Sequence, residues 1–160
     1  MGLFRPRQRR YVLMGMTPSD GRKHATILLV EDDPTLGDAF ARVLRGAGYE
    51  VWLTAKAEEG LEKARLVRPQ AIIVDFRMPL VNGLGFLYRL RSSEAVQSTP
   101  VAVVTGDTSL SQDVRAQLQE LGADLRMKPI MPNELVALVR GMVGEPVPEL
   151  AQETPQRIVW

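Results

Sequence analysis

Ala71-Ile72-Ile73-Val74-Asp75 is the stretch that decides the fold, because four apolar residues run directly into a carboxylate. A continuous apolar run of this length is typical of a strand buried on both faces of a parallel sheet. Similar runs occur at residues 26–30 and 101–104 and a shorter one at 51–53, and residues 125–127 indicate a weaker strand. The sequence therefore predicts five strands.

Amphipathic helices are expected between these strands, since apolar residues recur there at steps of three and four. In the first helix this pattern runs from Leu36 to Ala47. It follows Asp33-Pro34, which is typical of an N-cap and a proline at the first helical position. Phe40 and Trp52 are expected in the core. The other helices are indicated at residues 57–64, 84–90, 114–121 and 135–142.

Alternating strands and helices within residues 25–143 imply a doubly wound α/β fold with a five-stranded parallel sheet. In such folds, ligands bind beyond the carboxyl ends of the strands. Polar side chains follow four of the expected strands at that end: Glu31, Asp32 and Asp33, then Asp75, Thr105 and Lys128. We therefore expect a polar site at this edge of the sheet.

The chemistry of these side chains suits phosphoryl transfer with a divalent ion. Clustered carboxylates repel one another and take up protons unless a cation lies among them. Oxygen ligands favour Mg²⁺, and a lysine with a threonine hydroxyl can bind phosphoryl oxygens. The chain has no cysteine, and its one histidine, His24, lies in a polar segment, so a carboxylate is the plausible nucleophile. This set indicates an aspartyl-phosphate site.

Five motifs carry a resemblance to a known family: Leu29–Asp33, Val74–Pro79, Asn82-Gly83, Val104–Gly106 and Lys128-Pro129. Together they resemble the receiver domain of two-component response regulators, in particular single-domain, chemotaxis-regulator-like members. The resemblance implies a flavodoxin-like (βα)5 sandwich with strand order 2-1-3-4-5. It also implies a stand-alone receiver that is not an enzyme. Such a domain accepts a phosphoryl group from a sensor histidine kinase or a histidine phosphotransfer protein, and signals by a phosphorylation-dependent surface change.

The resemblance also implies a role for each acidic residue. Asp75 would be the phosphoacceptor. Asp32 and Asp75 would give carboxylates to Mg²⁺, and the main-chain carbonyl of Arg77 would be a third ligand. Glu31 would act through a coordinated water. Glu31 and Asp32 match the pair of acidic residues that the family has after its first strand. Asp33 falls outside this pair, which agrees with its interpretation as the helix cap.

Two further residues would contact the phosphoryl group. Thr105 would donate to a phosphoryl oxygen, and Lys128 would bridge to the phosphate or to Asp75. The Lys128–Pro129 bond is expected to be cis by this resemblance. Leu125 occupies the position where the family usually has an aromatic residue that moves with the threonine. Whether that coupling operates here stays open.

Arg77 and Asp107 lie two positions after the acceptor and the threonine, where the family tunes dephosphorylation. A cation there can shield the phosphoryl group from water, whereas a carboxylate can orient water. The sequence leaves the sign of the net effect open. Asp107 or Ser109 is also the expected cap of the fourth helix.

Two other functions stay open. One is a binding module that keeps the fold but signals without phosphorylation, for which Leu125 is the best argument. The other is a haloacid-dehalogenase-like phosphatase with an aspartate nucleophile. Such enzymes need a second aspartate two residues after the nucleophile, where this chain has Arg77.

The 160 residues carry 20 basic and 19 acidic side chains, but their distribution is uneven. The first 23 residues hold six basic and one acidic residue. Residues 1–24 are therefore expected to form a basic, disordered extension, and residues 144–160 a short Pro- and Glu-containing tail without an output domain. The longest early apolar run is too short for a membrane span, so a cytoplasmic location is expected. No membrane or nucleic-acid partner is expected, and a homodimer through the fourth helix, fifth strand and fifth helix stays open.

Overall fold

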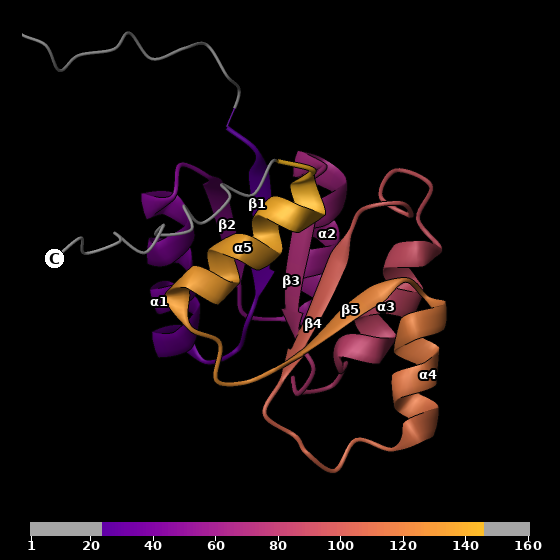
Figure 1. The fold of residues 1–160 in the computed structure, drawn as a ribbon. Helices are drawn as coiled ribbons and strands as arrows, with labels where there is room; N and C mark the ends of the chain where they lie inside the picture. The colour runs from indigo at the N-terminus through magenta and orange to yellow at the C-terminus, as the bar shows by residue number, and fades with distance from the viewer. Residues whose placement is uncertain (1–23, 146–160) are drawn as a thin grey trace, which may run out of the picture.

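A parallel sheet forms the middle layer of the computed structural model, which describes residues 24–145 (Figure 1). Its strands are β1 (Thr26–Val30), β2 (Glu50–Thr54), β3 (Ala71–Asp75), β4 (Val101–Thr105) and β5 (Ala123–Met127). They pair in the order β2-β1-β3-β4-β5, which confirms the predicted fold and strand order. The extensions predicted at residues 1–24 and 144–160 lie, apart from His24, Gly144 and Glu145, outside the described residues.

Helices cover both faces of the sheet. They are α1 (Pro34–Gly46), α2 (Ala57–Val67), α3 (Gly83–Arg91), α4 (Gln112–Glu120) and α5 (Pro132–Val143). α1 and α5 pack together on one face, and α2, α3 and α4 line the other, as Figure 1 shows. Between residues 24 and 145, no helix is long and apolar enough to cross a membrane.

Alternate residues of the central strands enter two separate cores. Leu28 and Val30 of β1 pack on the side of α2, α3 and α4, whereas Ile27 and Leu29 pack on the side of α1 and α5. All four side chains are almost fully buried. Because both faces of the sheet are covered, its central strands are apolar at nearly every position. This is why continuous apolar runs marked them in the sequence.

Side-chain caps determine where the helices begin near the carboxyl edge of the sheet. The Asp33 carboxylate accepts hydrogen bonds from the main-chain N–H groups of Thr35 and Leu36, at 2.9 and 3.2 Å, so the predicted cap of α1 is confirmed. The predicted cap of α4 is wrong. Ser111 caps that helix, since its hydroxyl accepts from the N–H of Val114 at 3.3 Å. The loop after β4 is therefore longer than the sequence indicated.

Trp52 is not a core residue, which corrects a second prediction. Its exposed fraction is 38%, whereas Phe40 is buried as expected. The reason is the strand order: β2 lies at the edge of the sheet, so its outward positions have a neighbour on one side only. The Lys63 ammonium lies over the indole ring, 4.3 Å from its centroid, in a cation–π contact.

The loop from β3 to α3 contains a three-residue turn. The N–H of Val81 donates to the carbonyl oxygen of Pro79 at 2.8 Å, and Leu80 between them has a φ of 68°. A hydrogen bond to the second residue back with a positive φ at the centre is the pattern of the rare γ-turn. This loop leads directly away from the end of β3.

Candidate functional site

Three carboxylates meet where β1 and β3 end. Glu31 and Asp32 follow β1, Asp75 is the last residue of β3, and the two strands are neighbours in the sheet. Each residue offers a carboxylate oxygen, and these oxygens lie within 4.8 Å of one another. Glu31 and Asp75 are buried, whereas Asp32 is exposed. The structure therefore brings together the three acidic side chains that the sequence indicated for metal binding.

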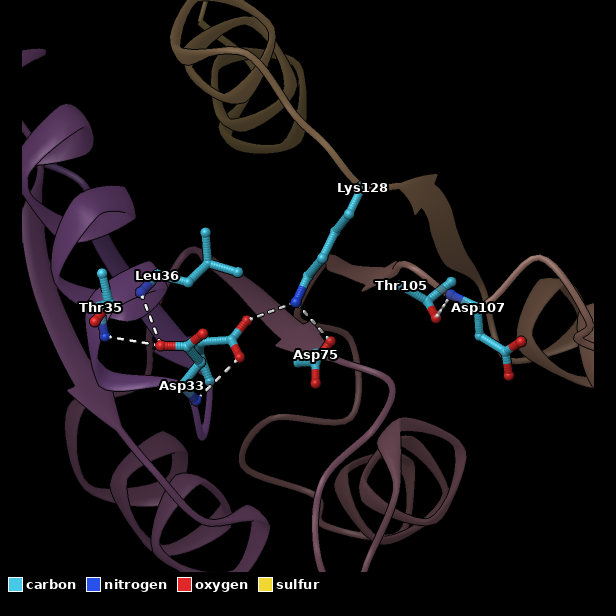
Figure 2. A network of polar contacts seen from close by, with 8 residues as sticks. Asp33, Thr35, Leu36, Asp75, Thr105, Asp107 and Lys128 are labelled. Carbon is cyan, nitrogen blue, oxygen red and sulfur yellow. Dashed lines mark hydrogen bonds and ion pairs between the residues drawn. The ribbon is translucent and has the colours of Figure 1, made fainter.

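Lys128 reaches this acidic cluster from β5. Its ammonium nitrogen lies 3.0 Å from Oε2 of Glu31 and 3.0 Å from Oδ1 of Asp75. Figure 2 shows its side chain extending to Asp75 from the segment that follows β5. The following bond, Lys128–Pro129, is cis as expected. One lysine thus contacts carboxylates at the ends of two different strands.

Burial and the nearby ammonium have opposite effects on the pKa values of the buried acids in this cluster. Burial raises the pKa of Glu31 and of Asp75, although hydrogen bonds from Lys128 counteract the effect. The pKa of Lys128 is also raised, because its hydrogen bonds to Asp75 and Glu31 outweigh the effect of its burial. A single ammonium faces three carboxylates, so the cluster keeps an excess of negative charge when all are ionised.

The donor set fits a small, hard divalent cation. All three side chains offer oxygen atoms, and Asp32 faces solvent, so an ion can enter from outside and keep some of its water. A hollow next to Asp32 is lined by Phe76, Arg77, Met78, Pro79 and Asn82. The main chain of Arg77, a predicted ligand, therefore lies beside the acids. Its N–H hydrogen-bonds Asp75 and lowers the pKa of that carboxyl.

Thr105 ends β4, the strand between β3 and β5, and its side chain is fully buried. Its hydroxyl oxygen accepts a hydrogen bond from the N–H of Asp107 at 3.0 Å (Figure 2). Since a hydroxyl can accept and donate at the same time, its hydrogen stays available for another acceptor. Leu125, at the usual aromatic position, packs partly buried against the core beside α2, α3 and α4.

Arg77 and Asp107 form an ion pair that sequence reasoning missed. The guanidinium donates to Oδ2 of Asp107, while Oδ1 accepts from the N–H of Ser109 at 2.8 Å and from its hydroxyl. The hydrogen bonds from Ser109, and then that from Arg77, lower the pKa of Asp107 to about 2. A signal for this pair was present, since opposite charges stand two positions after the last residues of two neighbouring strands.

Comparison with known proteins gives a consistent result. The sequence profile of the response regulator receiver domain matches residues 27–140. The DNA-binding response regulator MtrA of Mycolicibacterium smegmatis is 35% identical over 114 residues, which cover 71% of this chain and 48% of that protein. This chain thus spans about half the length of the curated relatives it matches.

Solved structures with the same architecture include the chemotaxis protein CheY4 of Vibrio cholerae, with a TM-score of 0.69 and 29% identity over 75% of this chain and 99% of that one. Another is the receiver domain of the sensor histidine kinase PA1611 from Pseudomonas aeruginosa PAO1, solved with a magnesium ion in its active-site cleft. Its TM-score is 0.68 at 28% identity, over 77% of this chain and all of that one. The acidic cluster, the lysine and these matches agree, and the chain belongs to the response regulator receiver domain family.

Proposed function

We propose that this domain accepts a phosphoryl group on Asp75, with Mg²⁺ bound, from a phosphohistidine of a sensor kinase or a phosphotransfer protein. The observation that carries the proposal is the contact of the Asp75 carboxylate with Lys128, 3.0 Å away, within a cluster of acids that can hold a metal ion. An aspartate in this position has both a cation beside it and a site for a second one.

Several groups around Asp75 would bind the Mg²⁺ ion together. Asp32, Asp75 and the main-chain carbonyl of Arg77 would hold the ion, and Glu31 would act through a water on it. When bound, Mg²⁺ supplies positive charge that offsets the charge of the transferred phosphoryl group. Asp32 is the exposed member of the set, so it is the first carboxylate that an entering ion meets.

The transfer itself requires one bond to form and one to break. An oxygen of Asp75 attacks the phosphorus, and the bond from phosphorus to the donor's histidine nitrogen breaks, with its electron pair returning to the imidazole. Lys128 places its ammonium against the phosphoryl oxygens, and Thr105 donates its free hydroxyl hydrogen to one of them. Asp75 would act as a phosphoacceptor and not as the nucleophile of an enzyme with rapid turnover, since Arg77 stands where a phosphatase needs a second aspartate.

The signal would leave through a shift in the surface formed by α4, β5 and α5. A ligand shifts such an equilibrium only by binding one state better than the other, so the contacts that Thr105 and Lys128 make with the phosphoryl group must differ between states. The relative MtrA is named as a DNA-binding response regulator. The stand-alone character and the cytoplasmic location predicted from the sequence stay predictions, and so does a homodimer.

One experiment separates this function from its rivals. The full chain is incubated with phosphoramidate, with and without Mg²⁺, and its intact mass is measured. We expect one phosphoryl adduct with Mg²⁺ and none with a chelator or in Asp75→Asn. Asp38→Asn, which changes an exposed aspartate of α1, is the matched control and should be labelled like the wild type.

Two other results would contradict the proposal. Release of inorganic phosphate in many turnovers without an adduct would indicate a phosphatase. The absence of an adduct together with the absence of Mg²⁺ binding would indicate a phosphorylation-independent binding module, which the leucine at position 125 favours.

A further inference from the structure

Leu80 combines two unfavourable features. Its side chain is fully exposed, with a relative accessibility of 102%. Its backbone has a φ of 68°, at the centre of the turn closed by the hydrogen bond from Val81 to Pro79. A residue with a side chain is strained in this left-handed region, and glycine or asparagine is the usual choice. Folding therefore gains nothing from a leucine here.

The rest of the loop is held in place. Met78 is buried, and Val81 packs partly buried against the same core that lies beside α2, α3 and α4. The loop is thus anchored on both sides of the turn, and the turn presents the Leu80 side chain to solvent from a supported backbone. Strained positions held by their surroundings are characteristic of functional sites.

The turn lies in the loop that directly follows Asp75. Leu80 lies five residues after Asp75, and Arg77, Met78 and Pro79 of the same loop line the hollow beside Asp32. Asp75 is only 6% exposed. Because the donor's phosphorus must come within bonding distance of a recessed carboxylate, the donor's surface must press on the surrounding loops. Leu80 belongs to one of these loops and is exposed.

The geometry points to Leu80 as a docking contact for the phosphoryl-donor protein, inserted into an apolar patch next to the donor's histidine. This inference rests on the proposed phosphorylation of Asp75. An apolar side chain that becomes buried in an interface contributes affinity roughly in proportion to the apolar area that it removes from water. The turn holds the backbone before binding, so little backbone freedom is lost when the contact forms.

The test compares a protein donor with a small one. Purified sensor kinases are autophosphorylated with ATP, and the kinase that transfers fastest to the wild-type chain serves as the protein donor. Leu80→Asn and Leu80→Gly both accept the positive φ and remove the apolar contact. We expect kcat/KM for transfer from the kinase to fall about tenfold or more in both. Labelling by phosphoramidate should stay at the wild-type rate.

Further variants separate docking from folding. The Tm of Leu80→Gly is expected to equal or exceed that of the wild type, because glycine adopts this φ without strain. Leu80→Met keeps an apolar side chain of similar volume and should restore most of the transfer. Leu66→Asn changes another exposed leucine, at the end of α2, and should transfer normally.

Wild-type transfer from the kinase to Leu80→Asn would overturn the inference. Loss of concentration-dependent self-association in Leu80→Asn, with transfer unchanged, would overturn it in favour of a contact between two copies of this chain. Failure of phosphoramidate to label even the wild type would instead refute the phosphorylation of Asp75, which is a separate result.

Discussion

The Arg77 guanidinium is bound to the Asp107 carboxylate, so the loop after β3 is joined to the loop after β4. Both carboxylate oxygens of Asp107 are engaged, one by Arg77 and the other by Ser109. A carboxylate with both oxygens engaged is poorly placed to orient a water for attack on a phosphoryl group. The sequence left the net effect of these two residues open, and the pairing favours protection.

We therefore expect Arg77→Ala to shorten the lifetime of the phosphorylated form. Removing the guanidinium opens the joined loops to water and frees Asp107, so hydrolysis should be about three to ten times faster, which corresponds to about 1 kcal/mol in the barrier. The decay of the adduct after removal of phosphoramidate measures the rate. Arg126→Ala, which breaks the ion pair with Asp124 on β5, is the matched control. An unchanged or longer lifetime in Arg77→Ala would contradict the protective interpretation.

The titration of Asp107 gives a second prediction. Its pKa lies at about 2, below the ordinary value of 3.8, owing to Ser109 and then Arg77. A carboxyl with a lowered folded-state pKa contributes stability above its unfolded pKa, and this contribution is lost as the pH falls through the folded value. NMR of the side-chain carboxyl carbon should show a midpoint near 2 in the wild type and a higher one in Ser109→Ala. A wild-type midpoint near 3.8 would show that these hydrogen bonds do not persist in solution.

The buried acids that form the site are expected to lower the stability of the fold at neutral pH. The pKa values of Glu31 and Asp75 are raised, mainly by burial. Such groups contribute stability when protonated, and this contribution is lost as the pH rises through the folded-state values. At neutral pH without Mg²⁺, Asp75→Asn should thus be as stable as the wild type or more stable, by up to about 1 kcal/mol or roughly 2–4 °C in Tm.

Mg²⁺ should reverse this order. The ion offsets the repulsion among the acids of the wild type, so its Tm should rise with Mg²⁺ at neutral pH and rise less in acid, where protons compete. Asp75→Asn should respond weakly. Thermal unfolding with and without Mg²⁺ at two pH values measures both effects, and an equal Mg²⁺ response in the two proteins would exclude Asp75 as a ligand.

Two helix glycines should respond in opposite directions to the same substitution. A Cβ on Gly60 of α2 would lie 2.8 Å from Cγ2 of Val30, so Gly60→Ala should destabilise the protein by about 1–3 kcal/mol through overpacking. A Cβ on Gly141 of α5 meets nothing within 4 Å, so Gly141→Ala should stabilise by about 0.5–1 kcal/mol through helix propensity. Urea unfolding measures both changes, and a stabilising Gly60→Ala would show that α2 can move away from β1.

Sequence patterns predicted the features that depend on burial along whole strands. The run ending at Asp75 is apolar because the strand is covered on both faces, and Asp33 caps α1 through a purely local hydrogen bond. What the patterns missed depends on position across the sheet or on loop geometry. Trp52 is exposed because its strand is at an edge, and the cap of α4 moved to Ser111 because the loop before it is longer. The strained turn at Leu80 depends on the sign of one φ angle, which the residue type argues against.

The contact between Glu31 and Lys128 joins residues that are 97 positions apart in the chain. The acids lie at the ends of the first and third strands, and the lysine follows the last, so no fragment lacking β5 can bring the lysine to the acids. Loop closure over such a separation comes late, after shorter-range contacts have formed. A newly made molecule would thus become competent to receive a phosphoryl group only once its whole sheet is complete, and misfolded chains would be silent in signalling.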